Sequence, residues 1–144
     1  MTLSVKKLFR IGAICMLIIG VGHTVGHFII AIKNKEANAA RDKILSDMSS
    51  SFPEISILSM YQGFSLAMGS MLIFFGLLCL FIKQPDKKVL ILTLLASVIL
   101  VVLSFRYFPL PPKALSPIAF LAFATANIVF YRKREVDKTS SENI

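Results

Sequence analysis

Two histidines lie close together in a long apolar segment of the chain. His23 and His27 are the two histidines of the 144-residue sequence, and three residues separate them. On a helix, residues at this spacing share one face, with Cβ atoms about 5–6 Å apart. Two neutral imidazoles placed in this way can share a metal ion, pass a proton or bind a carbonyl group through a hydrogen bond. Another interpretation gives the pair a structural role, in which its hydrogen bonds hold helices together.

Polar residues in other apolar segments match the depth of these histidines. Counted at about 1.5 Å per residue from the nearest helix end, Gln62 and Ser104 lie about as deep as His27, and Ser65 lies about as deep as His23. Polar and ionisable side chains inside an apolar segment are costly and usually face other helices. We therefore predict a polar pocket that opens at one end of the protein. Its residues are His23, His27, Gln62, Ser65, Ser104 and Arg106, with Tyr61 and Tyr107 at the rim.

The residue types limit the chemistry that this pocket could perform. A metal site normally needs three or four protein ligands, so a metal held by His23 and His27 is an open alternative that lacks further ligands in the apolar segments. No particular cofactor is predicted. Arg106 either binds an anionic group or extends to lipid head groups. The apolar segments contain no nucleophile–base pair, no pair of carboxylates and no phosphate-binding loop. An enzyme with a histidine as general base is therefore the less favoured class.

Four long apolar segments position these residues. They cover residues 8–32, 57–82, 89–108 and 114–131. Each is close to the length of about 20 residues with which a helix crosses the hydrocarbon of a bilayer. Apolar residues form 56% of the chain, against about 45–50% in a typical soluble domain. The sequence thus predicts an all-α integral membrane protein, in which residues 1–135 form a single four-helix bundle.

The segments outside the spans complete this prediction. Residues 36–48 have apolar side chains near one helix face, which predicts a short extracytoplasmic helix between the first two spans. The tight turn at residues 84–86 predicts that the second and third helices are antiparallel neighbours. Residues 136–144 are polar and are expected to form a disordered cytoplasmic tail. Small residues should bring the helices together, with Gly22 and Gly26 facing stripes that contain Ser65, Gly69 and Gly76, and Ser97 and Ser104.

The distribution of charge predicts an orientation. The net charge is +8, but the basic residues flank apolar segments and form no stripe or motif for nucleic acid. Ten of the sixteen Lys and Arg lie on the side that holds both termini. The excess of positive charge on the cytoplasmic side of membrane proteins then places both termini in the cytoplasm. The basic residues are expected to contact anionic lipid head groups.

Two motifs resemble those of a known group of proteins. They are the run Gly-His-Thr-Val-Gly-His-Phe at residues 22–28 and the run Gln-Gly-Phe-Ser at residues 62–65. Both are similar to motifs in a group of small bacterial membrane proteins without an assigned role. In outline the chain is also similar to the DoxX-like four-helix membrane proteins. The resemblance implies a four-helix fold and an inner-membrane location, and it supplies no catalytic residue.

The predicted pocket favours one class of function and leaves a second open. The first is a membrane protein that binds a small or lipid-like molecule, such as a quinone or another component of a redox chain. The alternative is a structural or accessory subunit of a membrane complex, with no chemistry of its own. A membrane-protein partner or a second copy of the chain is compatible with both functions.

Overall fold

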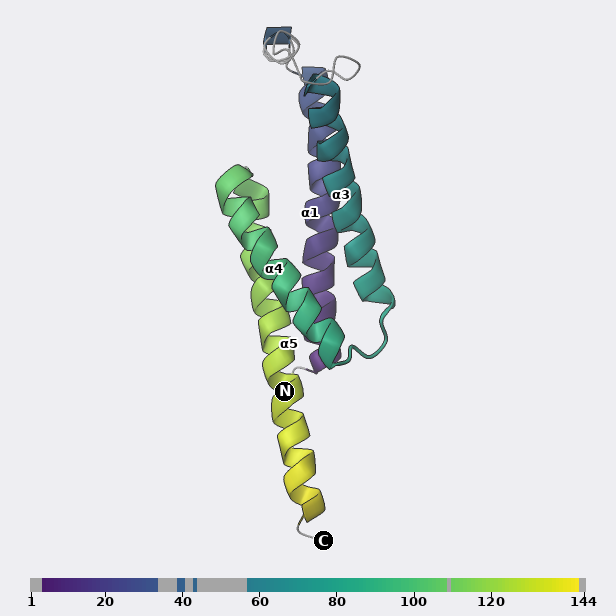
Figure 1. Ribbon diagram of the computed structural model, residues 1–144, viewed down its shortest axis with the longest axis vertical. Coiled ribbons are helices and arrows are strands. Elements are labelled where there is room, and N and C mark those ends of the chain that lie inside the picture. The colour runs from purple at the N-terminus through teal and green to yellow at the C-terminus, as the bar shows by residue number, and fades with distance from the viewer. Residues whose placement is uncertain (1–3, 34–38, 41–42, 44–56, 109, 143–144) are drawn as a thin grey trace.

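The protein consists of four long helices and contains no strand in the part of the chain that is described (Figure 1). The computed structural model describes residues 4–33, 39–40, 43, 57–108 and 110–142, and for residues 30–33, 57–59, 61 and 136–142 it describes the backbone alone. The helices are α1 (Val5–Lys33), α3 (Ile57–Phe81), α4 (Lys87–Tyr107) and α5 (Leu110–Glu142). All four are long and apolar enough to cross a membrane. The predicted all-α fold with four apolar helices is confirmed, and it is consistent with a multi-pass membrane protein.

Local sequence explains both ends of α4. Asp86 is the N-cap, and its Oδ1 accepts a hydrogen bond of 2.8 Å from the backbone N–H of Val89. A carboxylate at this position pairs one of the N–H groups that the first turn of a helix leaves free. At the other end Phe108 is extended, with φ −106° and ψ 156°, and residue 109 is a proline. Because a residue before proline disfavours the helical conformation, α4 ends at Tyr107.

α5 is longer at both ends than the predicted fourth span. It begins at Leu110 because the two prolines of its first turn fit a position where a missing N–H breaks no helical hydrogen bond. It ends at Glu142 and extends well beyond the other helices (Figure 1). The backbone of residues 136–142 continues α5, residues 143–144 lie outside the described residues, and the disordered cytoplasmic tail stays a prediction. Starting a helix is costly, whereas each residue added to an existing helix gains a hydrogen bond. This favours the continuation of α5 into a polar segment.

The helices pack in an order that differs from their order along the chain. α1 packs against both α3 and α5, and α5 packs against α4. α3 lies on the opposite side of α1 from α5 (Figure 1), and over their described lengths α3 and α4 do not pack against each other. The prediction that the helices joined by the turn at residues 84–86 are neighbours is therefore wrong. A short connection limits the distance between two helix ends, whereas small residues determine which helices approach closely.

The predicted short helix between the first two spans falls mostly on residues that are not described. Of residues 36–48, the structure describes 39, 40 and 43, and these three are helical. The remainder of that prediction lies outside the described residues.

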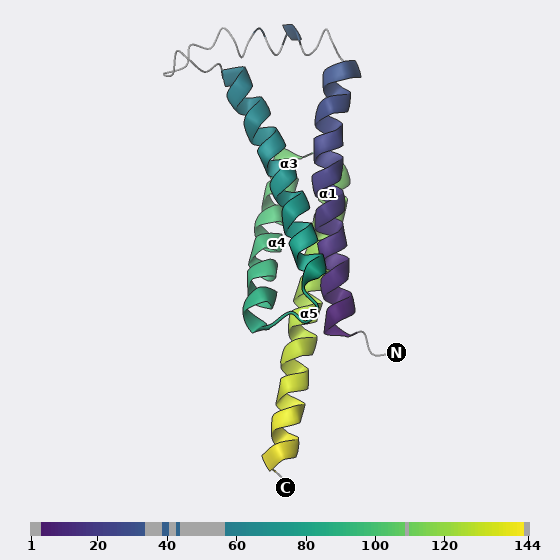
Figure 2. The same cartoon turned by 90° about the vertical axis from the view of Figure 1, so that its right-hand side faces the viewer.

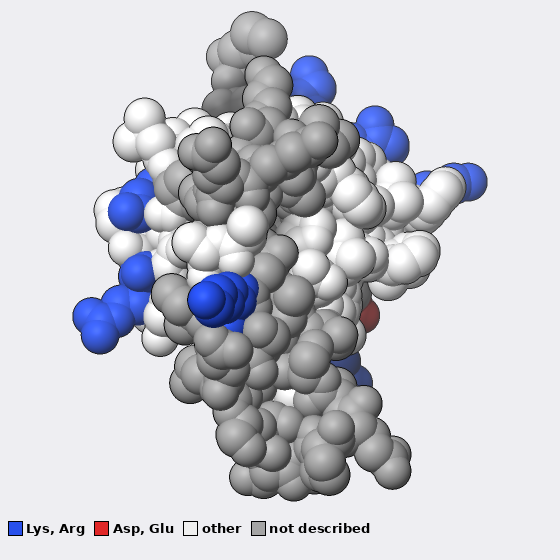
Figure 3. All heavy atoms as spheres, turned by 90° about the horizontal axis from the view of Figure 1, so that it is seen from above, with Lys and Arg blue, Asp and Glu red and all other residues white. Residues whose placement is uncertain are grey.

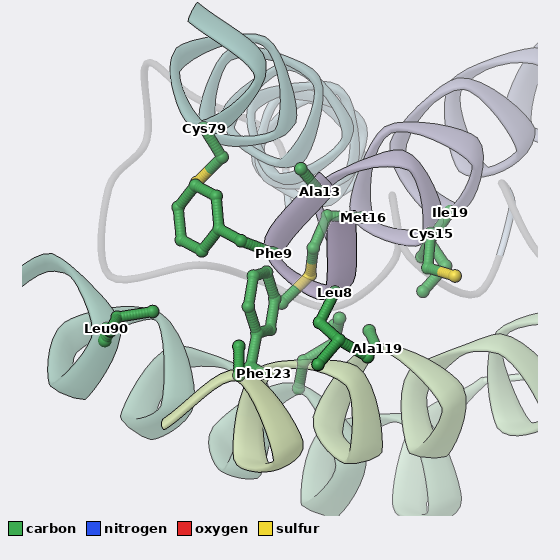
Figure 4. Packing of buried hydrophobic residues seen from close by; sticks show 12 residues of the cluster. Leu8, Phe9, Ala13, Cys15, Met16, Ile19, Cys79, Leu90, Ala119 and Phe123 are labelled. Atoms are coloured by element: carbon green, nitrogen blue, oxygen red, sulfur yellow. The ribbon is translucent and has the colours of Figure 1, made fainter. Parts of the chain in front are cut away.

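The apolar core lies toward the end of the bundle at which α1 begins. Its members on α1 lie between Leu8 and Ile19, and they meet residues of α3, α4 and α5 (Figure 4). Phe9 of α1 and Phe123 of α5 form an edge-to-face pair with ring centroids 5.6 Å apart. Beyond Gly20, none of the described side chains of α1 is buried. The tightly packed half of the molecule is therefore separate from the half that carries the two histidines.

Glycines allow α1 and α3 to approach each other closely. A Cβ atom built on Gly76 would lie 2.9 Å from the backbone nitrogen of Leu17, and Gly20 meets the backbone of α3 in a similar way. By contrast, a Cβ atom built on Gly22 or Gly26 would meet nothing within 4 Å. The prediction that Gly22 and Gly26 face the other helices is therefore wrong. The helical phase turns these two glycines to the surface and places Gly20 at the interface.

Candidate functional site

α1 and α3 separate toward the end at which α1 finishes and α3 starts (Figure 2). Their last close approach is at Gly69, where an added Cβ atom would overlap Oγ1 of Thr24. The Thr24 hydroxyl is held there because it donates a hydrogen bond of 3.0 Å to a carbonyl in the preceding turn of its own helix. Farther along, nothing lies within 4 Å of a Cβ atom built on Gly63. We call the diverging segments, residues 21–29 of α1 and 60–68 of α3, the fork.

Two histidines of α1 meet one serine of α3 where the fork begins. Nε2 of His23 lies 3.1 Å from the carbonyl oxygen of Ser65 and 3.2 Å from its Oγ. Nδ1 of His27 lies 3.2 Å from the same Oγ. All three residues are half-buried. These residues form the His–Ser–His cluster, in which both imidazoles of α1 bind one hydroxyl of α3.

The hydrogen bonds of the cluster limit which ring nitrogens carry hydrogen. A carbonyl oxygen accepts and cannot donate, so Nε2 of neutral His23 is the donor and its Nδ1 is bare. Two arrangements satisfy His27: the Ser65 hydroxyl donates to a bare Nδ1, or Nδ1–H of His27 donates to the Ser65 oxygen. The first arrangement places the ring hydrogen of His27 on Nε2. It leaves an acceptor free on His23 and a donor free on His27.

Phe108 supports His23 from a third element. The two rings are edge-to-face, with centroids 5.3 Å apart and planes at 74°. Phe108 is the residue that caps the end of α4, so the turn between α4 and α5 lies against the imidazole. The aromatic neighbour of His27 in the described residues is Phe28 of its own helix. His23 is thus held by two neighbouring elements, whereas His27 is held by α3 through Ser65.

The other residues of the predicted pocket do not join the cluster. Ser104 is fully buried on α4, a helix that packs against α5. Arg106 is exposed near the end of α4, and Gln62 is half-buried on α3. In the described part of the chain, none of these three residues forms a hydrogen bond with either histidine. Of the predicted rim residues, Tyr107 is 75% exposed, and the side chain of Tyr61 lies outside the described residues.

Thr24 and Phe108 belong to the site although the sequence did not predict them. The signal for Thr24 was present, because Gly20 and Thr24 are four residues apart and Gly69 offers a facing small residue. An interface of small residues at this position would have predicted that the two histidines lie beside α3. Phe108 had no comparable signal, because its contact with His23 depends on how α4 and α5 lie beside α1.

The described side chains near the fork include two cations and no complete set of metal ligands. Figure 3 views the molecule from the fork end and shows several Lys and Arg but very little Asp or Glu among the described residues. On the neighbouring helix ends, Arg106 is exposed and Lys113 is half-buried. No group of three His, Cys, Asp or Glu in the described residues could hold a metal ion. Within the described chain, a metal at this site would therefore depend on the two histidines and on the oxygens of Ser65.

Comparisons with protein-family models, with curated proteins and with solved structures find no match to this chain. The likeness of the two motifs to those of small bacterial membrane proteins, and the likeness in outline to DoxX-like membrane proteins, therefore stay predictions from the sequence.

Proposed function

We propose that this protein is a multi-pass protein of the inner membrane that binds a small or lipid-like molecule of the quinone type at the His–Ser–His cluster. Four helices of sufficient length and apolarity support the membrane location. The ten Lys and Arg on the side of the termini support cytoplasmic N- and C-termini. In this orientation the fork lies in the outer leaflet of the bilayer.

The observation that carries the binding proposal is the pair of free ring nitrogens. Among the described residues, Nδ1 of His23 and Nε2 of His27 have no hydrogen-bond partner. Both histidines are half-buried, and a polar atom without a partner is costly in an apolar environment. A ligand that pairs these two nitrogens would remove that cost. When His27 carries its hydrogen on Nε2, a carbonyl of the head group can accept from His27 and a hydroxyl can donate to His23.

The surface of the fork fits the apolar part of such a molecule. Phe28 of α1 is 53% exposed, and Phe64 of α3, next to Ser65, is 72% exposed. A hydrocarbon or isoprenoid chain can cover this surface while the head group reaches the histidines. Polar groups at the base of an apolar surface are the usual composition of a site for small apolar ligands.

The test compares wild type with the His23→Ala/His27→Ala double variant, both purified in the same mild detergent. Each sample is extracted with organic solvent and analysed by absorption spectroscopy, and its metal content is determined by elemental analysis. The wild type should retain a quinone-type molecule that the double variant loses. Asn127→Ala is the matched control, because it removes a hydrogen bond between α4 and α5 and leaves the cluster intact.

Two results would change this interpretation. Equal retention by wild type and the double variant would contradict the binding proposal. A stoichiometric metal that disappears with the histidines would replace it with a metal site.

A structural or accessory subunit is the second candidate function, and the surface of α3 favours it. The face of α3 that α1 leaves uncovered carries five large apolar residues, each between 63% and 79% exposed. They recur every three, four or seven residues, which is the spacing of a helix–helix seam. These residues are Phe64, Met71, Phe74, Leu78 and Phe81. In a bilayer this stripe contacts either lipid tails or a helix of another subunit.

This second function makes a different prediction for the double variant. His23→Ala/His27→Ala would lower the melting temperature in detergent, and the wild type would copurify with a larger complex or with a second copy of itself. A solitary, monodisperse protein whose melting profile is unchanged in the double variant would count against it.

A further inference from the structure

We infer that the His–Ser–His cluster passes a proton between its two imidazoles through the hydroxyl of Ser65. With the head group of the proposed function bound, its hydroxyl gives a proton to His23, its carbonyl receives one from His27, and the reverse transfer restores both oxygens. The identity of that molecule rests on the proposed function. The transfer within the cluster is a property of the protein alone and can be tested without a ligand.

The geometry supplies both links that such a transfer needs. Nε2 of His23 and Nδ1 of His27 each lie 3.2 Å from Oγ of Ser65, which is at the long end of hydrogen-bond distances for these atoms. A hydroxyl donates and accepts at the same time, and a neutral imidazole does the same through its two nitrogens. Every group in the chain can therefore release one hydrogen while it receives another.

The transfer balances atom by atom. A proton binds Nδ1 of His23, and the hydrogen on Nε2 of His23 moves to Oγ of Ser65. The original hydrogen of the Ser65 hydroxyl moves to Nδ1 of His27, and His27 releases the hydrogen on its Nε2. One proton enters at His23 and one leaves at His27. Ser65 begins and ends with a single hydrogen, and no oxidant or reductant takes part.

The carbonyl of Ser65 gives this exchange a resting state. At rest, the N–H of His23 points at the carbonyl oxygen 3.1 Å away. After one transfer the bare Nε2 faces that oxygen, and two lone pairs oppose each other. The chain is therefore driven back to its starting arrangement before it can pass a second proton. Such a device delivers one proton and recovers it, which suits a head group whose oxygen is alternately protonated and deprotonated.

Among the described side chains, few charged groups belong to the helix ends near the cluster. α3 contains no charged residue along its length, and its titratable side chains are Tyr61, which lies outside the described side chains, and Cys79, which lies in the core. The corresponding ends of α4 and α5 carry Arg106, Tyr107 and Lys113. The first two are exposed and Lys113 is half-buried. On α1 the side chain of Lys33 lies outside the described side chains.

The relay is tested by NMR on the full-length protein in detergent micelles, with labelled histidine and no added ligand. The Cε1 signals report protonation, and long-range correlations to the ring nitrogens report which nitrogen carries hydrogen. In the wild type both neutral rings should carry hydrogen on Nε2. The first protonation step should appear at both rings, each signal moving by about half of its full range, as expected for a coupled pair.

Substitution of Ser65 separates a relay from two independent histidines. In Ser65→Ala the first step should be confined to one ring. His27 should lose its preference for hydrogen on Nε2, whereas His23 should keep its own because the backbone carbonyl remains. Ser65→Thr retains a hydroxyl and should restore both features. If Ser65→Ala does not fold, His27→Gln serves in its place, and the first step should then appear at His23 over its full range.

The relay is overturned by either of two results. One is a first step that both rings share equally in wild type and in Ser65→Ala, since the rings then interact through charge alone. The other is a wild-type His27 that carries its hydrogen on Nδ1. Ligand retention is measured separately, so a cluster that shares a proton but retains no quinone would remove the proposed function and leave the relay standing.

Discussion

The two helix pairs of this protein begin with similar packing and end differently. α4 and α5 stay together along α4, whose buried residues recur every three or four positions from Leu90 to Ser104. α1 and α3 pack closely as far as Gly69 and then diverge into the fork (Figure 2). Each pair also contains a polar side chain that hydrogen-bonds to the backbone of its partner helix. These are Asn127 in the first pair and His23 in the second.

The comparison shows what separates a structural polar contact from a candidate site. The amide nitrogen of Asn127 donates to the carbonyls of Leu90 and Phe123, at 2.9 Å and 3.0 Å, and Asn127 is buried. Both of its N–H groups are used, in a part of the protein where the helices are closed. His23 and His27 each retain a free ring nitrogen where the helices open. A polar side chain in an apolar helix pair therefore becomes available for binding when the helices part before its bonding capacity is used.

A substitution that forces α1 and α3 apart should have the largest effect on the free energy of unfolding. In Gly76→Ala the new methyl group meets the backbone of α1 at 2.9 Å, so the helices must shift, at a cost of about 1–3 kcal/mol. Gly22→Ala is the matched control, because its methyl group enters open space and alanine favours the helix by up to about 1 kcal/mol. The free energy of unfolding, measured in mixed micelles of mild detergent and dodecyl sulfate, should fall for the first variant alone. Equal effects would mean that the two helices do not pack through Gly76.

Removing the hydrogen bond between α4 and α5 should lower the free energy of unfolding by a smaller amount. Asn127→Ala loses the hydrogen bond to Leu90, and such bonds between apolar helices contribute about 0.6–1.7 kcal/mol. The same unfolding measurement should detect this loss, while the tautomers of His23 and His27 stay unchanged by NMR. A changed tautomer in this variant would show that the two helix pairs are not independent.

Substitution of two buried serines by alanine should have the smallest effect on stability. Oγ of Ser104 and Oγ of Ser116 are buried and have no hydrogen-bond partner in the described structure. Removal of an unpaired hydroxyl leaves no partner unsatisfied, so Ser104→Ala and Ser116→Ala should leave stability unchanged or raise it slightly. Ser97→Ala is the control, because the Ser97 hydroxyl donates a bond of 2.7 Å to the carbonyl of Leu94. If Ser104→Ala proves more destabilising than Ser97→Ala in thermal melts, the Ser104 hydroxyl has a partner, such as a bound water.

Part of the site could be read from the sequence because helix geometry is regular. The spacing of His23 and His27 places them on one face, and counting along the helices places Ser65 at about the depth of His23. The structure joins these three residues. The same counting grouped Ser104 and Arg106 with them, since depth along a helix says nothing about the direction in which a side chain points. Those two residues belong to α4, which faces α5 and not α3.

Four long apolar helices, with polar side chains at matching depths, could be predicted without a structure. Both are local properties, set by the run of apolar residues and by the constant rise of a helix. The tertiary structure alone decided which helices pair and which glycines lie between them, and it also decided that α1 and α3 part beside the histidines. These features depend on the fit of complete helix surfaces. Gly20 and Gly22 are two residues apart, about 200° around the helix, so Gly20 lies at the interface and Gly22 on the outside.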